Sequence, residues 1–304
     1  MDRESFLLEK EELPQIESIG VLRIYKKLIG VNKMKREFIS YPKSGRTWIR
    51  YILAQLGLEK YINFHHDQFE FNDGSKPPHN FDIELRRQKY KKTDKIVYLE
   101  RDPRDVMVSL YFQVTGRFKD IFNYKGTISE FICDKYFGAY NLCKFREMWN
   151  QLVKENNYLK ITYEECHENM QKVIEKIIDY YGFCVDKKRV KEAVVNATFE
   201  KMRKLEESGK FPEPWLRPRQ GALKVRRGVV HGYKDYLSKE DIDFLNSIFF
   251  SNKENNISQM SIYSNYSMKQ DKIEKIKKSI IVLGMHRSGT SMTAGVLHRL
   301  GVNM

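Results

Sequence analysis

The sequence lacks the marks of secreted, membrane-spanning and disulfide-stabilised proteins. Its four cysteines show no CxxC spacing and indicate free thiols in a reducing compartment; they are Cys133, Cys143, Cys166 and Cys184. No apolar run approaches the roughly 18 residues of a transmembrane helix. Residues 1–35 are charged throughout, without the apolar core of a signal peptide. These absences predict a cytoplasmic protein with no integral membrane segment.

The chain also lacks a Walker A loop, G-x-x-x-x-G-K-[ST], in which lysine follows the second glycine. Around Gly45 the order differs, because Lys43 precedes the glycine and Arg46 follows it. Near the end of the sequence, Gly284 and Gly289 have the Walker spacing, but Thr290 occupies the lysine position. A kinase-like, P-loop nucleotide-binding protein is therefore only the alternative hypothesis.

Acidic residues are outnumbered, 40 Asp and Glu against 54 Lys and Arg, which gives a net charge of +14. Such an excess favours an anionic partner: a nucleotide, an acidic substrate, a nucleic acid or a membrane surface. The basic residues are not gathered in one block, which weakens the case for a nucleic-acid-binding module. Steep salt dependence of binding to DNA or RNA would favour that third hypothesis.

What the sequence does contain is a strand, a tight loop and a helix within residues 37–57. Phe38 to Tyr41 read as a short buried strand, and Pro42 and Gly45 interrupt it. From Thr47 the apolar residues fall at helical spacing, and they are Trp48, Ile49, Ile52, Leu53 and Leu56. The loop therefore lies at a helix N-terminus, where free N–H groups and the helix dipole favour a phosphate or sulfate.

The residues of this loop suit an anion, although an ordinary turn with surface basic residues is the competing interpretation. Tyr41-Pro42-Lys43-Ser44-Gly45-Arg46-Thr47-Trp48 matches YPKSGTTW at seven of eight positions. That motif is the 5′-phosphosulfate loop of the sulfotransferases that use 3′-phosphoadenosine 5′-phosphosulfate (PAPS), and the segment resembles it. The resemblance implies cofactor-binding roles for Lys43, Ser44, Gly45, Arg46, Thr47 and Trp48, with Arg46 at a threonine position.

A second strand, Lys95 to Glu100, runs into a helix that Asp102 caps and Pro103 begins. The sequence from Arg101 to Tyr111 resembles the sulfotransferase pattern R-[ND]-P-[RK]-D-V-x-V-S-x-[YF]. This resemblance implies that Arg101 and Ser109 bind the 3′-phosphate of PAPS. An N-capped core helix with an incidental Arg and Ser is the competing interpretation.

Three later segments also resemble the family, and they follow in family order. Tyr158 to Tyr163 reads as a third strand followed by Glu164-Glu165, and the resemblance implies that Tyr163 reaches the adenine. Residues 197–202 resemble T-S-F-x-x-M, which implies that Phe199 and Trp48 sandwich the base, unless Phe199 is an ordinary core aromatic.

The last of these segments lies at residues 224–238 and resembles R-K-G-x-x-G-D-W-K-x-x-F-[ST]. The resemblance implies that Arg226, Arg227 and Gly228 clamp the 3′-phosphate. His231 stands at a glycine position, which leaves the local backbone in question.

Sulfuryl transfer requires a base, and the candidate is His66 in the triplet His65-His66-Asp67, which resembles a Thr-His-Asp-like triplet of the family. An imidazole with a pKa near 6.5 suits a base at neutral pH. Phe64 stands where other members have a second lysine, so that role cannot be transferred. His65 as the base stays open, and a His-His-Asp zinc site is less favoured because no further ligands cluster nearby in the sequence.

These segments predict an α/β fold, a three-layer α/β/α arrangement with a central parallel sheet of the P-loop-like sulfotransferase kind. Among its helices we expect a single one from Ile128 to Glu155, capped by Thr127, and another over residues 169–181.

The chain is expected to divide into four parts. They are an N-terminal helical segment (1–35), a sulfotransferase domain (36–250), a linker (251–278) and the truncated start of a second P-loop or sulfotransferase-like domain (279–304). A βα unit packed on the main domain is the alternative for the last part.

The hypothesis is thus a PAPS-dependent sulfotransferase, with His66 as base and Lys43 on the leaving oxygen, and with no metal. The acceptor would be a small molecule, a carbohydrate or a lipid and not a nucleic acid. The sequence leaves the acceptor's identity and the oligomeric state open.

Overall fold

The computed structural model describes residues 34–71, 73–209 and 217–250. The expected N-terminal helical segment (but for its last two residues), the linker and the second domain start therefore lie outside the described residues. The helices and strands are, in chain order, β1 (Arg36–Ser40), α2 (Arg46–Gln55), η1 (Glu59–Tyr61), β2 (Asn63–His65), α3 (Ile83–Tyr90), β3 (Lys95–Glu100), α4 (Pro103–Phe112), η2 (Gln113–Arg117), α5 (Lys119–Phe122), α6 (Ile128–Ile132), α7 (Ala139–Asn156), β4 (Leu159–Thr162), α8 (Tyr163–Tyr181), α9 (Lys187–Asn196), α10 (Phe199–Glu207), η4 (Gly232–Asp235) and α11 (Lys239–Phe249).

The four strands form one parallel sheet in the order β2-β1-β3-β4. Phe38 of β1 is level with Phe64 of β2 and with Val97 of β3, and β3 in turn pairs with β4. Parallel neighbours need a crossover connection, and helices supply it here. The parallel sheet that the sequence predicted is confirmed.

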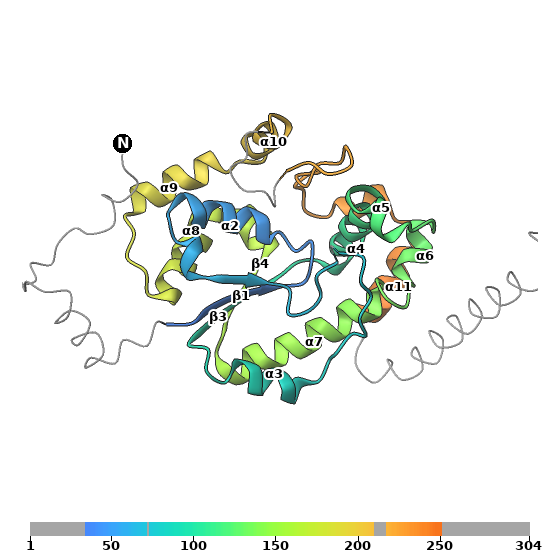
Figure 1. Cartoon of the computed structure of the whole chain (residues 1–304), viewed down its shortest axis with the longest axis horizontal. Helices are drawn as coiled ribbons and strands as arrows, with labels where there is room; N and C mark the ends of the chain where they lie inside the picture. The colour runs from blue at the N-terminus through green and yellow to red at the C-terminus, as the bar shows by residue number, and fades with distance from the viewer. Residues whose placement is uncertain (1–33, 72, 210–216, 251–304) are drawn as a thin grey trace, which may run out of the picture.

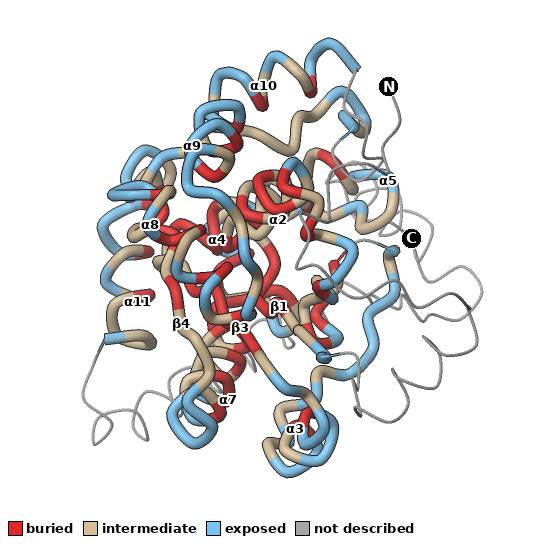
Figure 2. Tube along the Cα trace, turned by 90° about the vertical axis from the view of Figure 1, so that its left-hand side faces the viewer, coloured by how far each residue is buried: buried red, intermediate tan, exposed pale blue. Residues whose placement is uncertain are grey.

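Helices cover both faces of the sheet, as the layers in Figure 1 show. On one face Phe38, Val97 and Leu99 pack with apolar residues of α2, α8 and α9. On the other face Ile39 and Tyr98 pack with α3, α4, α7 and α11. Figure 2 shows the buried residues concentrated along β1, β3 and α2. This is the expected three-layer α/β/α arrangement, in which strand residues point alternately to the two layers.

The expected helix over 128–155 is wrong in one respect, because the structure divides it into α6 and α7. Thr127 does cap α6 as predicted, with a full capping box to Glu130. The chain then turns, and the Asp134 carboxylate accepts the N–H groups of Tyr136 and Phe137. Gly138, the N-cap residue of α7, is extended (ψ 176°), and a Cβ there would lie 2.2 Å from the Asp134 carbonyl oxygen. Periodicity of the apolar residues does not reveal such a break.

Two other boundaries also differ from the sequence prediction. The strand expected over 158–163 is β4, and Tyr163 already begins α8, capped by Thr162. Asn169, where a helix was expected to begin, is instead a kink inside α8 with φ −157°. Tyr163 is thereby placed directly at the carboxyl end of β4.

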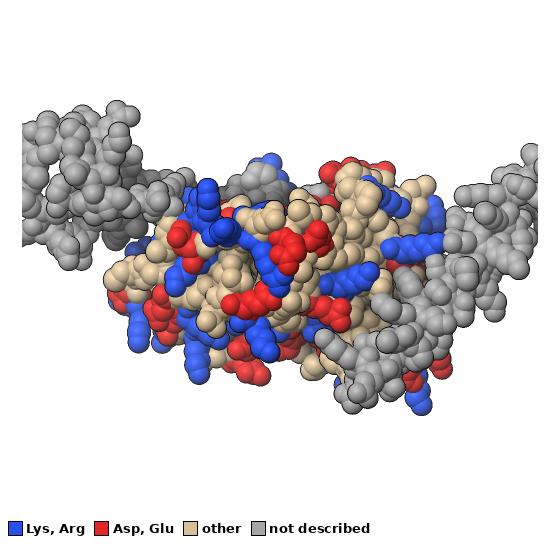
Figure 3. Space-filling view, turned by 90° about the horizontal axis from the view of Figure 1, so that it is seen from below, with Lys and Arg blue, Asp and Glu red and all other residues tan. Residues whose placement is uncertain are grey.

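The outer face seen in Figure 3 carries acidic and basic side chains intermixed. None of the helices in the described part of the chain is both long enough and apolar enough to cross a membrane. All four cysteines are free thiols, as the sequence predicted.

Candidate functional site

The loop after β1 turns back sharply before α2. The Ser44 N–H donates to the Tyr41 carbonyl (3.3 Å), and the Trp48 N–H donates to the Gly45 carbonyl (3.0 Å). Lys43 and Gly45 both have left-handed backbone, with φ of 71° and 99°. The predicted strand, loop and helix are all present, and the first turn of α2 opens toward the carboxyl ends of the strands.

A cavity of about 640 Å³ lies at this end of the sheet. Of the described residues that line it, ten are Lys or Arg and two are Asp or Glu. The ten basic residues are Lys43, Arg46, Arg50, Arg101, Arg117, Arg217, Arg219, Lys224, Arg226 and Arg227. The cavity therefore gathers positive charge, unlike the outer face in Figure 3, where both signs are intermixed.

The sequence-predicted site residues come together at this cavity. Thirteen of the fourteen line it, and they are Lys43, Gly45, Arg46, Thr47, Trp48, His66, Arg101, Ser109, Tyr163, Phe199, Arg226, Arg227 and Gly228. Ser44 does not line the cavity, because it is buried beneath the loop with 2% of its surface exposed. Residues separated by up to 185 positions in the sequence therefore line the same cavity.

Arg101, at the end of β3, connects two parts of this wall. Its guanidinium donates to the Lys43 carbonyl (3.1 Å) and the Val229 carbonyl (3.2 Å), and lies over the Tyr163 ring at 4.2 Å. Asp105, one turn into α4, accepts the His231 N–H (2.8 Å). The segment around residue 230 is thereby fixed to β3 and α4.

His231 resolves the question that the sequence left at this position. Its backbone has φ 59° and ψ 22°, which is the left-handed conformation that glycine adopts most easily. The Asp105 carboxylate accepts the N–H groups of both His231 and Tyr233, at 2.8 and 2.9 Å. The turn is thus retained although a histidine replaces the glycine.

Aromatic side chains line another part of the cavity. The Trp48 indole N–H donates to the Ala197 carbonyl (2.7 Å), and the Trp48 and Tyr163 rings meet at 6.1 Å. Gly228 has φ +63°, and a Cβ there would lie 2.4 Å from the Phe199 ring. The glycine therefore lets the backbone of the Arg226–Gly228 segment approach Phe199 closely.

His66 and His65 have different surroundings, although they are adjacent. The His66 Nδ1 lies 2.7 Å from the Ser40 carbonyl, so Nδ1 carries the proton and Nε2 is the basic nitrogen. His65 accepts the Asp67 N–H at Nδ1 (3.0 Å) and donates from Nε2 to Glu37 (2.9 Å). Both ring nitrogens of His65 are thus engaged, and only His66 of the pair lines the cavity.

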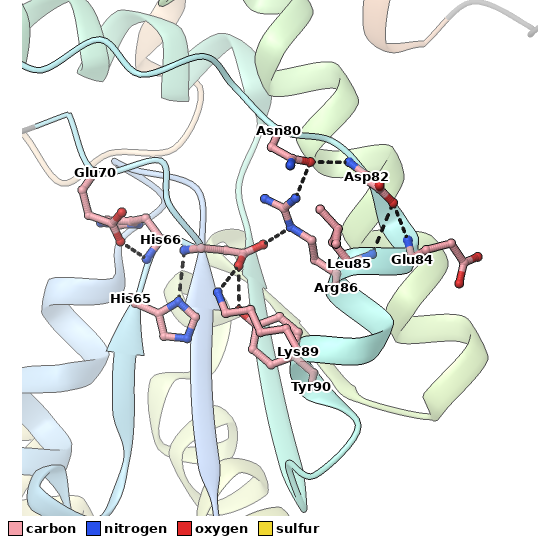
Figure 4. Close-up of polar contacts among 11 residues, drawn as sticks. His65, His66, Glu70, Asn80, Asp82, Glu84, Leu85, Arg86, Lys89 and Tyr90 are labelled. Carbon is pink, nitrogen blue, oxygen red and sulfur yellow. Dashed lines mark hydrogen bonds and ion pairs between the residues drawn. The ribbon is translucent and has the colours of Figure 1, made fainter.

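Asp67 anchors the loop that carries His66. Its buried carboxylate accepts hydrogen bonds from Arg86 (3.0 Å), Lys89 (2.7 Å) and Tyr90 (2.7 Å). Figure 4 shows these three side chains of α3 pointing toward the loop after β2, and Glu70 beside the backbone of His66. The Asp67 carboxylate therefore holds the loop that carries His66 from outside the cavity.

Charge and burial shift the pKa values of the cavity groups. Burial, with the charges of Arg117, Arg101 and Arg226, lowers the pKa of Lys43 to about 7. Burial and the neighbouring Arg50 lower the pKa of Arg46 to about 10. Burial and the Arg46 charge hold the pKa of His66 well below 6.5. Crowded cations of this kind favour the arrival of an anion, which would relieve their repulsion.

Four further residues of this region were missed by the sequence reasoning, namely Glu70, Arg117, Glu206 and Lys224. Glu70, Arg117 and Lys224 line the cavity, and the Glu206 carboxylate accepts a hydrogen bond from the Lys224 backbone N–H (2.6 Å). They lie in or beside residues 68–92, 115–126 and 205–222, where no local sequence pattern distinguishes them. Among the described residues, no three His, Cys, Asp or Glu side chains are grouped to hold a metal, so the zinc alternative has no ligand set there.

Gly45→Ala is expected to destabilise the fold and to deform the loop. Alanine would need φ +99°, and its Cβ would lie 2.4 Å from the Tyr163 ring. A strained position of this kind costs about 1–3 kcal/mol. Calorimetry should show a lower melting temperature and adenosine 3′,5′-bisphosphate (PAP) titration a weaker affinity. Gly57→Ala is the matched control, since Gly57 has φ +75° with nothing within 4 Å of an added Cβ; equal losses of PAP affinity in both variants would contradict the clash.

Comparison with known proteins shows the family that this chain resembles. The family model "Sulfotransferase domain" matches residues 75–261. Human Sulfotransferase 2B1 is 30% identical over 151 residues, which cover 47% of this chain and 40% of the human protein. Human Sulfotransferase 2A1 is 26% identical over 233 residues, covering 68% of this chain and 81% of the relative.

A solved structure shows the same fold. The crystal structure of mouse sulfotransferase SULT7A1 complexed with PAP has a TM-score of 0.53 and 17% identity, and the match covers 79% of this chain and 90% of that one. The chain spans less than half of the first curated relatives, 40% of human and 46% of mouse Sulfotransferase 2B1. The family model nevertheless matches more than half of the sequence, and the chain therefore belongs to the sulfotransferase domain family.

Proposed function

We propose that this protein transfers a sulfuryl group from PAPS to a hydroxyl or amine of a small molecule, carbohydrate or lipid. The observation that carries the proposal is the cationic cavity, in which residues from five separate sequence segments meet. The mouse relative crystallised with PAP supports the choice of nucleotide. The kinase-like alternative is disfavoured by the family membership and by the position of Lys43 before the glycine.

The residues present fit a nucleotide that carries two anionic groups. In the proposed pose the 3′-phosphate lies against Arg101, Ser109 and the Arg226–Gly228 segment, and the base lies between Trp48 and Phe199. Buried nitrogen atoms of two cavity arginines, Nη1 of Arg46 and Nε of Arg101, have no hydrogen-bond partner among the described residues. Buried donors without partners are costly, and anionic oxygens would satisfy them.

The proposed reaction is a direct displacement at sulfur. The acceptor oxygen forms the new bond to sulfur while the bond between sulfur and the bridging oxygen breaks, and its electron pair stays on the departing phosphate. His66 Nε2 takes the acceptor proton, since Nδ1 is committed to the Ser40 carbonyl. Lys43 stabilises the charge that develops on the bridging oxygen, and the protein otherwise positions groups that are already reactive.

A thermal-shift comparison tests the nucleotide class. PAP is expected to raise the melting temperature, because the cavity offers cations for two separate phosphate groups. ATP with magnesium is not expected to do so, because the proposed site assigns no carboxylates to a magnesium ion. A ligand at 100 times its Kd stabilises by about 2.7 kcal/mol, or roughly 5–10 °C for a domain of this size. A shift with ATP–magnesium alone would overturn the proposal in favour of the kinase-like alternative.

A further inference from the structure

Lys224 lies in the segment between α10 and η4, and its side chain lines the cavity together with Lys43, Arg46 and His66. It stands two residues before Arg226, outside every position to which the sequence assigned a role. Phe64, two positions before His66, has no charge. Its ring stacks on Phe38 at 5.2 Å in the apolar layer. Lys224 therefore brings a cation to the His66 side of the cavity from a distant part of the chain.

A buried carboxylate fixes the backbone at Lys224. Glu206 is 0% exposed, and its two oxygens accept the N–H groups of Lys224 (2.6 Å) and Val225 (2.8 Å). Arg117 lies 3.5 Å from the same carboxylate and donates to the Ala222 carbonyl (3.2 Å). Burying a carboxylate is expensive unless it is paired and hydrogen-bonded. Here that charge is used to hold two successive backbone N–H groups, and so to orient the side chain between them.

The charges around Lys224 indicate what it faces. Burial, then the charges of Lys43, Arg117 and Arg46, lower the pKa of Lys224 to about 7. The Lys224 charge also contributes to the low pKa of His66. The lysine lines the same cavity as Lys43 and Arg46 of the proposed phosphosulfate loop and as His66, the proposed base. Between those two groups lies the position that the transferred group must occupy in a direct displacement.

We propose that Lys224 is a second catalytic cation, which contacts the oxygens of the sulfuryl group during its transfer, while Lys43 stabilises the bridging oxygen. This proposal rests on the proposed function. In the reaction the sulfuryl group moves from the bridging oxygen to the acceptor oxygen, and its three outer oxygens remain negatively charged throughout. A cation fixed midway along this path contacts these oxygens best in the transition state, and it is not needed to hold the product PAP, which has no sulfuryl group.

The test compares Lys224→Met with Lys224→Arg and with Lys204→Met, which removes an exposed lysine from α10. Two readouts are used: PAP affinity by calorimetry, and single-turnover release of PAP from PAPS with water or a simple phenol as acceptor. For Lys224→Met we expect turnover to fall by about 10²–10³-fold, as for loss of one transition-state donor, while PAP affinity changes by less than about fivefold. Lys224→Arg should recover part of the turnover, and Lys204→Met should match the wild type.

A third readout does not depend on turnover. Vanadate can become five-coordinate when bound, with three oxygens in one plane like those of the group in transfer. Vanadate added with PAP should therefore raise the melting temperature of the wild type further, and this increment should be lost in Lys224→Met. If Lys224→Met does not fold, Lys224→Gln replaces it.

Turnover within threefold of wild type in Lys224→Met, or parallel losses of turnover and PAP affinity, would overturn the role of Lys224 alone. A wild-type protein that binds no PAP or releases none from PAPS would instead overturn the proposed function, and this inference with it.

Discussion

His66→Asn is expected to reduce sulfuryl transfer by about 10²–10⁴-fold, the usual contribution of a positioned general base. Asparagine keeps an N–H donor for the Ser40 carbonyl, which His66 Nδ1 contacts at 2.7 Å, but it has no basic nitrogen. The loop should therefore stay in place while proton transfer is lost. Measured PAP affinity should remain close to that of the wild type.

His65→Asn is the matched control for this variant. His65 is bound on both ring nitrogens, by Glu37 and by the Asp67 N–H, and it lies outside the cavity. Its replacement should lower stability while turnover stays within a few-fold of wild type. The assignment of the base would be reversed if His65→Asn abolished turnover and His66→Asn did not.

The pH dependence gives an independent check on His66. Burial and the Arg46 charge hold its folded-state pKa well below the unfolded value of 6.5. Between these two values the unfolded chain binds more protons, so stability falls as the pH drops below about 6.5. Because His66 is neutral down to the lower value, the acid limb of the turnover profile should also lie well below pH 6.5 if His66 is the base, and the His66→Asn variant should lose this limb.

Lys43→Met is expected to reduce turnover by about 10²–10³-fold while PAP affinity falls by no more than about tenfold. Methionine keeps most of the apolar stem of the lysine and removes only its charge. The Lys43 carbonyl still accepts the hydrogen bond of Arg101, so the loop should hold its shape. Single-turnover measurements beside PAP calorimetry separate the two effects, and a variant that turns over PAPS as fast as wild type would contradict the role of Lys43.

The Lys43 pKa predicts a difference between two pH profiles. Its value of about 7 belongs to the ligand-free cavity, and kcat/KM reports the free enzyme whereas kcat reports the complex. A bound anion favours the protonated lysine and raises the pKa. The value of kcat/KM should therefore decline from about pH 7 upward, while kcat persists to higher pH; coincident alkaline limbs would argue against a titrating cavity lysine.

The sequence predicted most of this site because its motifs are local. Only a few loop conformations can join a strand, Pro42, Gly45 and a helix. Each motif also contains, within a few positions, the residues that are proposed to contact the cofactor. Asp102 and Pro103 likewise predict the start of α4 directly, as its N-cap and its first residue. Since the strands are parallel, motifs that follow different strands meet at one edge of the sheet, which is why distant segments converge as expected.

The missed features depend on contacts that no short segment contains. The break between α6 and α7 arises from Asp134 and Gly138, although the apolar spacing continues through it. Lys224 reads as one lysine among many, since its orientation is set by the Glu206 carboxylate 18 positions earlier. The preference for His66 over His65 as the proposed base likewise depends on the Glu37 and Ser40 contacts, because His65 ends β2 while His66 lies in the loop that follows it.

The two hydrogen bonds of Arg101 have a consequence for how the molecule is made. They join β3 to Lys43 and to Val229, which are 58 and 128 positions away along the chain. Contacts of such long range form late, because long loops must close first, and synthesis delivers the N-terminal part before the rest. An emerging chain that ends before Val229 has the loop after β1 but lacks the opposite wall of the cavity. If the proposed function holds, the nucleotide can stabilise the growing chain only after Val229 has been added, and its binding then reports that the two walls of the cavity have met.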